Sequence, residues 1–446
     1  MRNAYFSIDD FFWLDIAHWR SVAASFVGTQ GAHDVYRPIF RLSVYLDALL
    51  FGQNAMGWHL DNLVIHAANS FLLAVVMRAY RLPYGACAAA AILFQFSPLS
   101  GETVDWISGR TASLCFLFML LAFWRWTLAL SASRAPWGTG GWMLLSAMTY
   151  EAGVILPGVL LCLFPIAQKW LGVSWQTGLR KLLPLLGILA VFLVVRGLFL
   201  GTFVGYTDAA GPDLWQNLFL QLDTLRRLYP GFGSVTSLWI LGGALIATSF
   251  IPAFFPAGPC LALSAVILLL PYVSAAGVGE RFFYMLQAPL CVVAVLPALL
   301  FPRRLRLVFL TMLLALLLPK FAVSDWDESL LWVRAGLKTK ALIAAVHEAI
   351  PKNDGWANVV DGVPDIDDVR GMMGGYFETG IKDSYQESAP FVVRGQAALA
   401  SPLLVKAILE QPTRFWRYDA ENQQLVPFGR TDWLNAHPEA KASLLR

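Results

Sequence analysis

Long apolar runs separated by short polar stretches dominate the first 323 residues of the chain. Because a helix needs about 20 mainly apolar residues to cross a bilayer, we interpret ten of these runs as membrane spans. They lie at residues 60–80, 84–98, 110–130, 139–150, 152–168, 182–200, 235–252, 259–276, 283–301 and 307–323. Gly153, Pro157 and Gly158 favour a break between the fourth and fifth runs. The pattern predicts an all-α polytopic membrane protein with about ten visible spans.

The pattern changes after the last of these runs. Residues 324–446 contain no apolar run long enough to cross a bilayer. Residues 329–350 have the periodicity of an amphipathic helix, and the short apolar runs at 357–360 and 391–393 are typical of strands. We therefore predict a transmembrane domain at 1–323, followed by a small soluble α+β domain at 324–446.

Charges in the loops predict the orientation of the spans. The basic loop residues fall in alternate loops, on one side of the membrane: Arg78, Arg81, Arg134, Lys169, Arg180, Lys181, Arg303, Arg304 and Arg306. By the positive-inside rule this side is cytoplasmic. The acidic residues before residue 330 all fall in the other loops or at that membrane face. We expect long acid-rich loops and the C-terminal domain on the outer, extracytoplasmic face, as in a multi-pass protein of a bacterial inner membrane.

The first 58 residues are polar and aromatic, and the orientation places them outside as the first outer loop. A helix with a cytoplasmic N-terminus should precede such a loop. We therefore expect a first helix that is missing from this sequence, which would bring the count to eleven.

Composition supports a membrane protein and narrows its chemistry. The chain is 57% hydrophobic and 14% charged, whereas soluble domains are about 45–50% apolar and about a quarter charged. A net charge of +3 is too small to indicate a nucleic-acid partner. The five cysteines lie inside apolar runs, and no cysteine or histidine pair has metal-ligand spacing. We expect no disulfide and no such metal site.

Two groups near the start of the chain are candidates for chemistry. Asp9 and Asp10 are adjacent carboxylates, so one of them should have a raised pKa and could serve as a general base. Alternatively, they cap a helix N-terminus. Arg37 could bind a phosphate in a bidentate manner, or pair with Asp34 or Asp47.

His59 and His66 lie seven residues apart on one face of the first predicted span. A lone histidine in such a place is more often a packing residue with its hydrogen bonds satisfied than a ligand.

Further candidates lie at the outer ends of later spans. Segment 97–110 brings Glu102 and Arg110 to the outer surface, either as a plain polar loop or as a site. Arg196 and Arg281 stand at the same level as Arg110, and three cations at one membrane face could cradle a lipid phosphate. Alternatively, each of these arginines could simply extend its charged end to the membrane–water interface. Glu280 and Tyr284 flank Arg281 and complete this group of candidates.

The order of these motifs resembles a known family. The acidic pair is followed by YRP…LFG…H…N…H, by E-x-V-x-WISGR, by a Tyr-Glu-x-Gly turn and by ERFFY. This set is similar to the GT-C superfamily of membrane glycosyltransferases, in particular the protein O-mannosyltransferases and the transmembrane-and-TPR O-mannosyltransferases with their bacterial relatives. The resemblance covers residues 5–323 and is most specific at 36–66, 97–110 and 280–284.

The resemblance implies a reaction and assigns roles. Such enzymes move a sugar from a polyprenyl-phosphate donor to a hydroxyl of a protein, lipid or glycan on the extracytoplasmic face, with inversion. Asp9 or Asp10 would be the catalytic base, and Glu102 and Glu151 would be supporting acids. The basic positions expected near the lipid phosphate match Arg196 and Arg281. No cofactor is implied with certainty, although paired carboxylates could hold a divalent cation.

The chain departs from the family pattern in four places. The first helix is absent, and Ser97-Pro98 stands where the family has His-Pro. Tyr150 replaces the Lys before Glu151, which leaves one phosphate-binding cation open. No TPR array follows, which leaves the acceptor open. The amphipathic segment 213–232 is predicted to lie on the membrane and help cover the donor.

Two other classes of function remain. A transporter or flippase of lipid-linked sugars would also place charges in spans, but such proteins tend to have inverted repeats and helices broken at mid-membrane. Here no repeat is visible and the charges crowd the outer face. A non-catalytic GT-C-like scaffold is the third class, and the presence of the acidic pair counts against it.

Overall fold

A computed structural model of the chain describes the following residues: 5–6, 10–28, 35–132, 135–200, 254–273, 280–350, 353, 355–363, 366–367, 370–371, 390–399, 402–438 and 440. Contacts divide the chain into two units. The membrane unit comprises residues 19–47 and 59–329, and the C-terminal unit comprises residues 1–18, 48–58 and 330–446.

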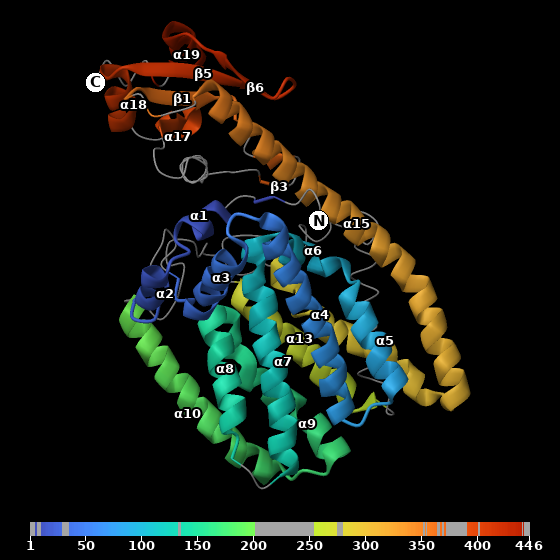
Figure 1. The fold of residues 1–446 in the computed structure, drawn as a ribbon. Helices are drawn as coiled ribbons and strands as arrows, with labels where there is room; N and C mark the ends of the chain where they lie inside the picture. The colour runs from blue at the N-terminus through green and yellow to red at the C-terminus, as the bar shows by residue number, and fades with distance from the viewer. Residues whose placement is uncertain are drawn as a thin grey trace. The chain divides into compact units, whose positions relative to one another are not determined.

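Most of the described helices lie wholly or mainly in the membrane unit (Figure 1). The α-helices are α2 (Trp19–Ser25), α3 (Pro38–Phe51), α4 (Ala55–Ala79), α5 (Tyr84–Gln95), α6 (Gly101–Asp105), α7 (Arg110–Ser131), α8 (Trp137–Thr149), α9 (Leu156–Leu171), α10 (Trp175–Leu200), α13 (Ala257–Val273), α14 (Gln287–Val295) and α15 (Arg303–Ala349). Short 3-10 helices are η1 (Pro98–Ser100), η2 (Ile107–Gly109), η3 (Glu151–Ile155), η5 (Glu280–Phe283) and η6 (Leu296–Leu300).

The predicted spans agree with these helices. Within the described residues, five helical stretches are long and apolar enough to cross a membrane: Ala55–Ala79, Ile107–Ser131, Glu151–Leu171, Trp175–Leu200 and Arg303–Ala349. Three shorter apolar helices occupy Tyr84–Gln95, Ala257–Tyr272 and Gln287–Leu300. The predicted span at 235–252 and the amphipathic segment at 213–232 lie outside the described residues. The prediction of an all-α polytopic membrane region is confirmed.

The predicted break between the fourth and fifth spans is also present. Helix α8 ends at Thr149, and Tyr150 has an extended backbone with φ −155° and ψ 143°. The chain then re-enters a helix through η3. This extended residue turns Glu151 out of the helical path, so the break positions an acidic side chain.

One predicted boundary differs from the structure. The pattern indicates two separate helices at 307–323 and 329–350, but α15 is continuous from Arg303 to Ala349 and contains Pro319. The intervening SDWDE segment is polar, yet it holds no Gly or Pro that would stop a helix. The polarity of the chain changes here, but its backbone conformation does not.

Among the five long apolar stretches of the described residues, the one that contains α7 is the most buried. Helix α7 packs against α8 and α9 (Figure 1). Helix α13 packs against α9, and α14 packs against α5. One continuous apolar core links these helices through buried side chains such as Leu93, Met119, Leu160 and Leu268. Because such packing holds the outer ends of the helices in fixed positions, it also fixes the loops that join them.

The C-terminal unit contains a small mixed sheet with strand order β4-β1-β5-β6. Its strands are β1 (Ala357–Asp361), β4 (Phe391–Arg394), β5 (Thr413–Asp419) and β6 (Gln424–Pro427). Strand β1 is parallel to β4 and β5, and β6 is antiparallel to β5. Helices α17 (Gly395–Leu399), α18 (Pro402–Glu410) and α19 (Arg430–Ala436) supply much of its apolar core. The strands predicted at 357–360 and 391–393 are confirmed as β1 and β4.

Candidate active site

Arg37 and Glu151 form the first of three ion-pair clusters in the membrane unit. The Arg37 Nη2 lies 2.8 Å from a Glu151 carboxylate oxygen, and its Nε donates to both carboxylate oxygens at 3.1 Å. The guanidinium also lies 4.7 Å from the centre of the Tyr150 ring. Arg37 therefore pairs with Glu151 rather than with Asp47, one of the alternatives that the sequence leaves open. A cation thus lies beside Tyr150, at the position where the resemblance implies a Lys.

Glu102 and Arg281 form the second cluster. One carboxylate oxygen of Glu102 lies 2.5 Å from the Arg281 Nη1, and the other accepts the Arg281 backbone N–H at 3.1 Å. The guanidinium lies over the rings of Trp106 and Phe282, at 4.7 and 5.0 Å. The Glu102 side chain thereby joins helix α6 to the 3-10 helix η5. The Arg281 guanidinium contacts Glu102, Trp106 and Phe282.

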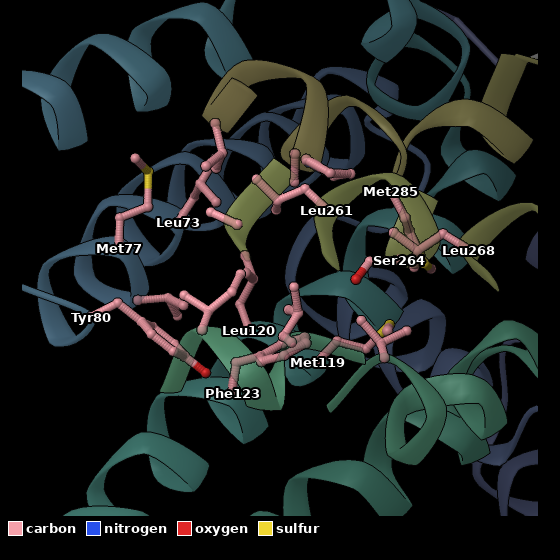
Figure 2. Close-up of a pocket in the computed structure, with 18 of the residues that line it drawn as sticks. Leu73, Met77, Tyr80, Met119, Leu120, Phe123, Leu261, Ser264, Leu268 and Met285 are labelled. Carbon is pink, nitrogen blue, oxygen red and sulfur yellow. The ribbon is translucent and has the colours of Figure 1, made fainter. Parts of the chain in front are cut away.

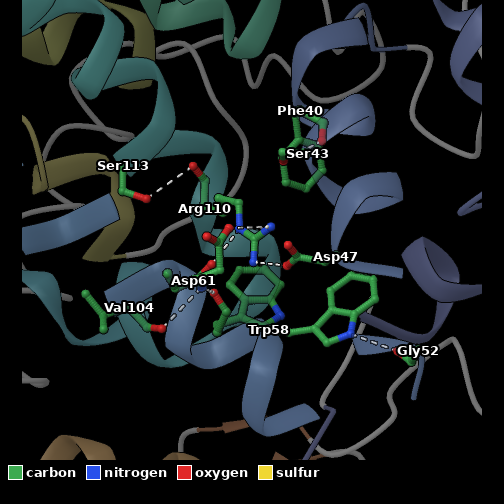
Figure 3. Close-up of polar contacts among 11 residues, drawn as sticks. Phe40, Ser43, Asp47, Gly52, Trp58, Asp61, Val104, Arg110 and Ser113 are labelled. Atoms are coloured by element: carbon green, nitrogen blue, oxygen red, sulfur yellow. Dashed lines mark hydrogen bonds and ion pairs between the residues drawn. The ribbon is translucent and has the colours of Figure 1, made fainter. Parts of the chain in front are cut away.

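Arg110 is the centre of the third cluster, at the start of α7. Its guanidinium lies 2.5 Å from a carboxylate oxygen of Asp47 and 3.3 Å from one of Asp61 (Figure 3). Its Nε donates to the Asn62 side-chain oxygen at 2.6 Å. Burial raises the pKa of Asp47 to about 6, although Arg110 opposes this rise. Arg110 is completely buried and faces two carboxylates.

The three arginines that were predicted to share one outer level lie in different surroundings. Arg110 belongs to the Asp47 cluster and Arg281 to the Glu102 cluster. Arg196, on α10, is buried. It lies between Phe192 and Phe199 in the sequence, and the rings of both pack against Tyr36, the residue before Arg37.

The histidine His66 of α4 has both ring nitrogens satisfied. His66 Nε2 lies 3.0 Å from the Gln95 carbonyl oxygen, which can only accept, so this nitrogen carries the proton. Its Nδ1 then accepts from the Tyr284 hydroxyl at 2.8 Å, and Tyr284 accepts from the Asn69 amide at 3.0 Å. This chain of bonds fixes the neutral tautomer. His66 is a packing residue, and Tyr284 joins α4 to the segment after η5. His59 is likewise buried on α4.

Asp10, the second residue of the acidic pair, lies in the C-terminal unit. Asp10 begins helix α1 (Asp10–Asp15) and is buried, with 1% of its surface exposed. Asp9 lies outside the described residues, as does the side chain of Glu280. Across the described part of the chain, no group of three His, Cys, Asp or Glu side chains could hold a metal ion.

Sequence reasoning missed the partners of Arg110. A signal for them existed: Asn62, His66 and Asn69 recur at spacings of four and three, which makes a polar stripe on an otherwise apolar span. In the structure this stripe meets Arg110, Tyr284 and backbone carbonyls of the 104–113 region. It is the surface on which α4 docks.

An apolar cavity of about 110 Å³ lies among α4, α7, α9, α13 and α14. Leu73 and Met77 of α4, Leu120 of α7, and Leu261 and Leu268 of α13 are among the side chains around it (Figure 2). Its lining is mostly aliphatic and aromatic, which suits a hydrocarbon chain rather than a polar substrate.

Comparisons with known proteins show what the chain resembles. No protein-family model matches it. It is similar to the protein O-mannosyl-transferase TMTC3 of Mus musculus, with 28% identity over 146 residues, which is 31% of this chain and 15% of that protein. It is also similar to the protein O-mannosyl-transferase Tmtc2 of Drosophila melanogaster, with 30% identity over 190 residues, which is 38% of this chain and 19% of that protein. The matches therefore span less than a fifth of these relatives.

A third relative agrees with these two: TMTC4 of Homo sapiens is 30% identical over 139 residues, which is 27% of this chain and 18% of that protein. Among solved structures, the chain resembles that of ArnT from Cupriavidus metallidurans bound to undecaprenyl phosphate. That likeness has a TM-score of 0.46 and 13% identity, and covers 94% of this chain and 90% of the other. The resemblance to the protein O-mannosyltransferases, inferred from the ordered motifs, is confirmed by these relatives.

Proposed function

We propose that the chain is a membrane glycosyltransferase that moves a sugar from a polyprenyl-phosphate donor to an acceptor hydroxyl on the extracytoplasmic face. The observation that carries this proposal is the pairing of loop residues far apart in sequence. Arg37 meets Glu151, and Glu102 meets Arg281, in the motifs that resemble the O-mannosyltransferases. The relatives that the chain resembles are named as enzymes of this reaction class.

Arginine side chains and an apolar cavity support a lipid phosphate as donor. Arg37, Arg196 and Arg281 provide cations, and guanidinium groups are suited to bind phosphate oxygens. Glu151 and Glu102 hold two of these arginines in fixed orientations, so little reorganisation is required when an anion arrives. The cavity could take part of the hydrocarbon chain. Undecaprenyl phosphate, which is bound in the ArnT structure, is a reasonable choice of carrier for the experiments.

The reaction requires a base and a stabilised leaving group. In this proposal Asp9 or Asp10 takes the proton of the acceptor hydroxyl, and the oxygen attacks the anomeric carbon of the sugar. The bond from that carbon to the phosphate oxygen breaks, and the phosphate leaves with the bonding electrons. Attack opposite to the leaving group inverts the anomeric carbon. The arginines stabilise the negative charge of the departing phosphate.

The test uses purified protein in liposomes with labelled undecaprenyl-phosphate sugars. We expect transfer by the wild-type chain, and a loss of roughly 100-fold or more in Asp9→Asn or Asp10→Asn, because a positioned base contributes about 10²–10⁴ to the rate. Asp15→Asn is the matched control, because Asp15 ends the same short helix and is exposed. The assignment of the base is wrong if both acidic-pair variants keep near wild-type rates. The proposed activity is wrong if the wild-type chain transfers no sugar from any such donor.

A further inference from the structure

Tyr272 is the penultimate residue of helix α13, and its ring packs against aromatic residues next to the first two ion-pair clusters. Its ring stacks on Phe282 with 4.7 Å between ring centres, and it lies 5.9 Å from the ring of Tyr150. Phe282 follows Arg281, and Tyr150 precedes Glu151. Tyr272 therefore packs against the residue next to Arg281 and the residue next to Glu151.

Tyr272 is buried, with only 3% of its surface exposed. Its hydroxyl nevertheless has no hydrogen-bond partner among the described residues. Removing a hydroxyl group from water without a new hydrogen bond is unfavourable. Most buried polar groups in proteins have a partner, so a hydroxyl without one calls for an explanation. A hydroxyl whose hydrogen-bond partner is a ligand atom would have no partner when the ligand is absent.

The charged side chains of the neighbouring ion pairs are partly open to a ligand. The side chains of Arg281 and Glu151 are 27% and 22% exposed. The hydroxyl and the guanidinium of Arg281 are both hydrogen-bond donors, so together they are suited to an oxygen that only accepts. Glu102 holds Arg281 in place before any ligand arrives. Two donors favour an anionic oxygen, which only accepts hydrogen bonds. A sugar hydroxyl is less suitable, because its own O–H would also need an acceptor.

The apolar cavity lies along the same face of α13, although Tyr272 is not among the residues that line it. Leu261 and Leu268 line it, and they precede Tyr272 by eleven and four positions, which are close to whole helical turns and place all three on one helix face. Leu268 is one helical turn, about 6 Å along the axis, from Tyr272. A molecule with a hydrocarbon chain and an anionic head would meet apolar side chains and then the hydroxyl as it follows this face.

We propose that the Tyr272 hydroxyl contacts the donor directly, by donating a hydrogen bond to a phosphate oxygen that Arg281 also binds. This inference rests on the proposed function, since it assumes a lipid-phosphate donor. It adds a ligand-binding residue that lies outside every motif of the family resemblance. It also explains why a tyrosine, rather than a phenylalanine, stands at this apolar helix end.

The test is Tyr272→Phe, which keeps the ring and its stacking on Phe282 and removes only the hydroxyl. Thermal unfolding in detergent is measured with and without undecaprenyl phosphate, and with undecaprenol as the uncharged probe. We expect the empty variant to unfold at the wild-type temperature or slightly above it, because no hydrogen bond is lost. We expect lipid-phosphate binding to weaken roughly ten- to a hundred-fold, as for a hydrogen bond to a charged group. Binding of undecaprenol should not change.

Two other tyrosines provide controls. Tyr284→Phe removes a hydroxyl that has two partners, so the empty protein should unfold at a lower temperature. Tyr84→Phe alters an exposed residue at the start of α5 and should change neither unfolding nor lipid binding. The inference is overturned if Tyr272→Phe lowers the unfolding temperature of the empty protein as Tyr284→Phe does. It is also overturned if the variant binds undecaprenyl phosphate as tightly as the wild type, or weakens both probes equally.

The failure of this inference can be distinguished from failure of the proposed function. If the wild-type chain binds the lipid phosphate and transfers sugar, and Tyr272→Phe does both equally well, only the proposed Tyr272–phosphate contact is wrong. If the wild-type chain neither binds undecaprenyl phosphate nor transfers sugar, the proposed function and the contact fail together.

Discussion

At the scale of single residues, Arg110 shows how the membrane unit accommodates charge. The guanidinium is completely buried, and it is held by two carboxylates and one amide oxygen. A buried ion pair contributes little net stability over a well-packed apolar alternative, but removing one partner leaves a charge that is costly, by about 3–5 kcal/mol. The main effect of the cluster is therefore to set the relative positions of α3, α4 and α7, and its net contribution to stability is small.

The Asp47 carboxyl group predicts a specific dependence of stability on pH. Folding raises its pKa from 3.8 to about 6 through burial, so the folded chain holds this proton more tightly than the unfolded chain. The stability that this group contributes is complete below about pH 4 and is lost as the pH rises to about 6. The loss should be about 3 kcal/mol over this window, at 1.36 kcal/mol per unit of pKa.

Thermal unfolding of wild type and Asp47→Asn between pH 3.5 and 7.5 measures this effect, because the difference between the two profiles isolates one carboxyl group. We expect the difference to change between about pH 4 and 6 and to be constant on either side. Parallel profiles across the whole range would show that Asp47 does not titrate in this way.

At the scale of elements, the junction between α8 and α9 sets the position of Glu151. Tyr150 is extended, and η3 then turns back so closely on α8 that a Cβ at Gly153 would lie 2.5 Å from the Ser146 carbonyl carbon and 2.6 Å from the Ala147 nitrogen. Both atoms belong to a helix backbone, which cannot move aside cheaply. The close approach therefore requires glycine at this position.

Gly153→Ala should lower the stability by roughly 1–3 kcal/mol, the usual cost of forcing extra volume into a packed site. It should also lower sugar transfer, because η3 carries Glu151 and with it the Arg37 pair. Gly141→Ala is the matched control: it lies within α8, and a Cβ added there would meet no heavy atom of the described residues within 4 Å. That variant should be more stable by about 0.5–1 kcal/mol. Equal unfolding temperatures for the two variants would contradict the close-packing argument.

The spans could be predicted from sequence because the bilayer demands a minimum apolar length, and the break at Tyr150 could be predicted from nearby Gly and Pro residues. The continuity of α15 could not, because the polar segment SDWDE suggests a loop although it contains neither Gly nor Pro to stop a helix. Motif residues such as Glu102 and Arg281 could be singled out, but not their pairing. Arg37 and Glu151 are 114 positions apart, and no local spacing reports which distant side chains will meet.

At the scale of the whole molecule, the loop charges predict that both the acidic pair and the C-terminal unit are extracytoplasmic. The short connection between α9 and α10 lies beside Lys169, Arg180 and Lys181 and is predicted to be cytoplasmic. The C-terminal unit and the α9–α10 connection are therefore predicted to lie on opposite sides of the membrane.

Fusions to an alkaline phosphatase that folds only after export test this orientation in a bacterial host. A fusion after residue 440 should be active, and one after residue 173 should be inactive, because only the first would place the reporter outside. A cytoplasmic reporter such as β-galactosidase should give the opposite pattern. An inactive phosphatase at residue 440 together with an active one at residue 173 would reverse the predicted orientation.

The pairing of Glu102 with Arg281 also bears on how the chain is made. The two residues are 179 positions apart, and synthesis adds about 5–20 residues per second. Glu102 must therefore wait roughly 10–40 seconds after its own synthesis before its partner exists. Spans inserted early cannot reach their final packing in that interval. Assembly of this enzyme-like membrane unit is completed late, and a nascent chain that stalls before residue 280 would leave Glu102 without Arg281.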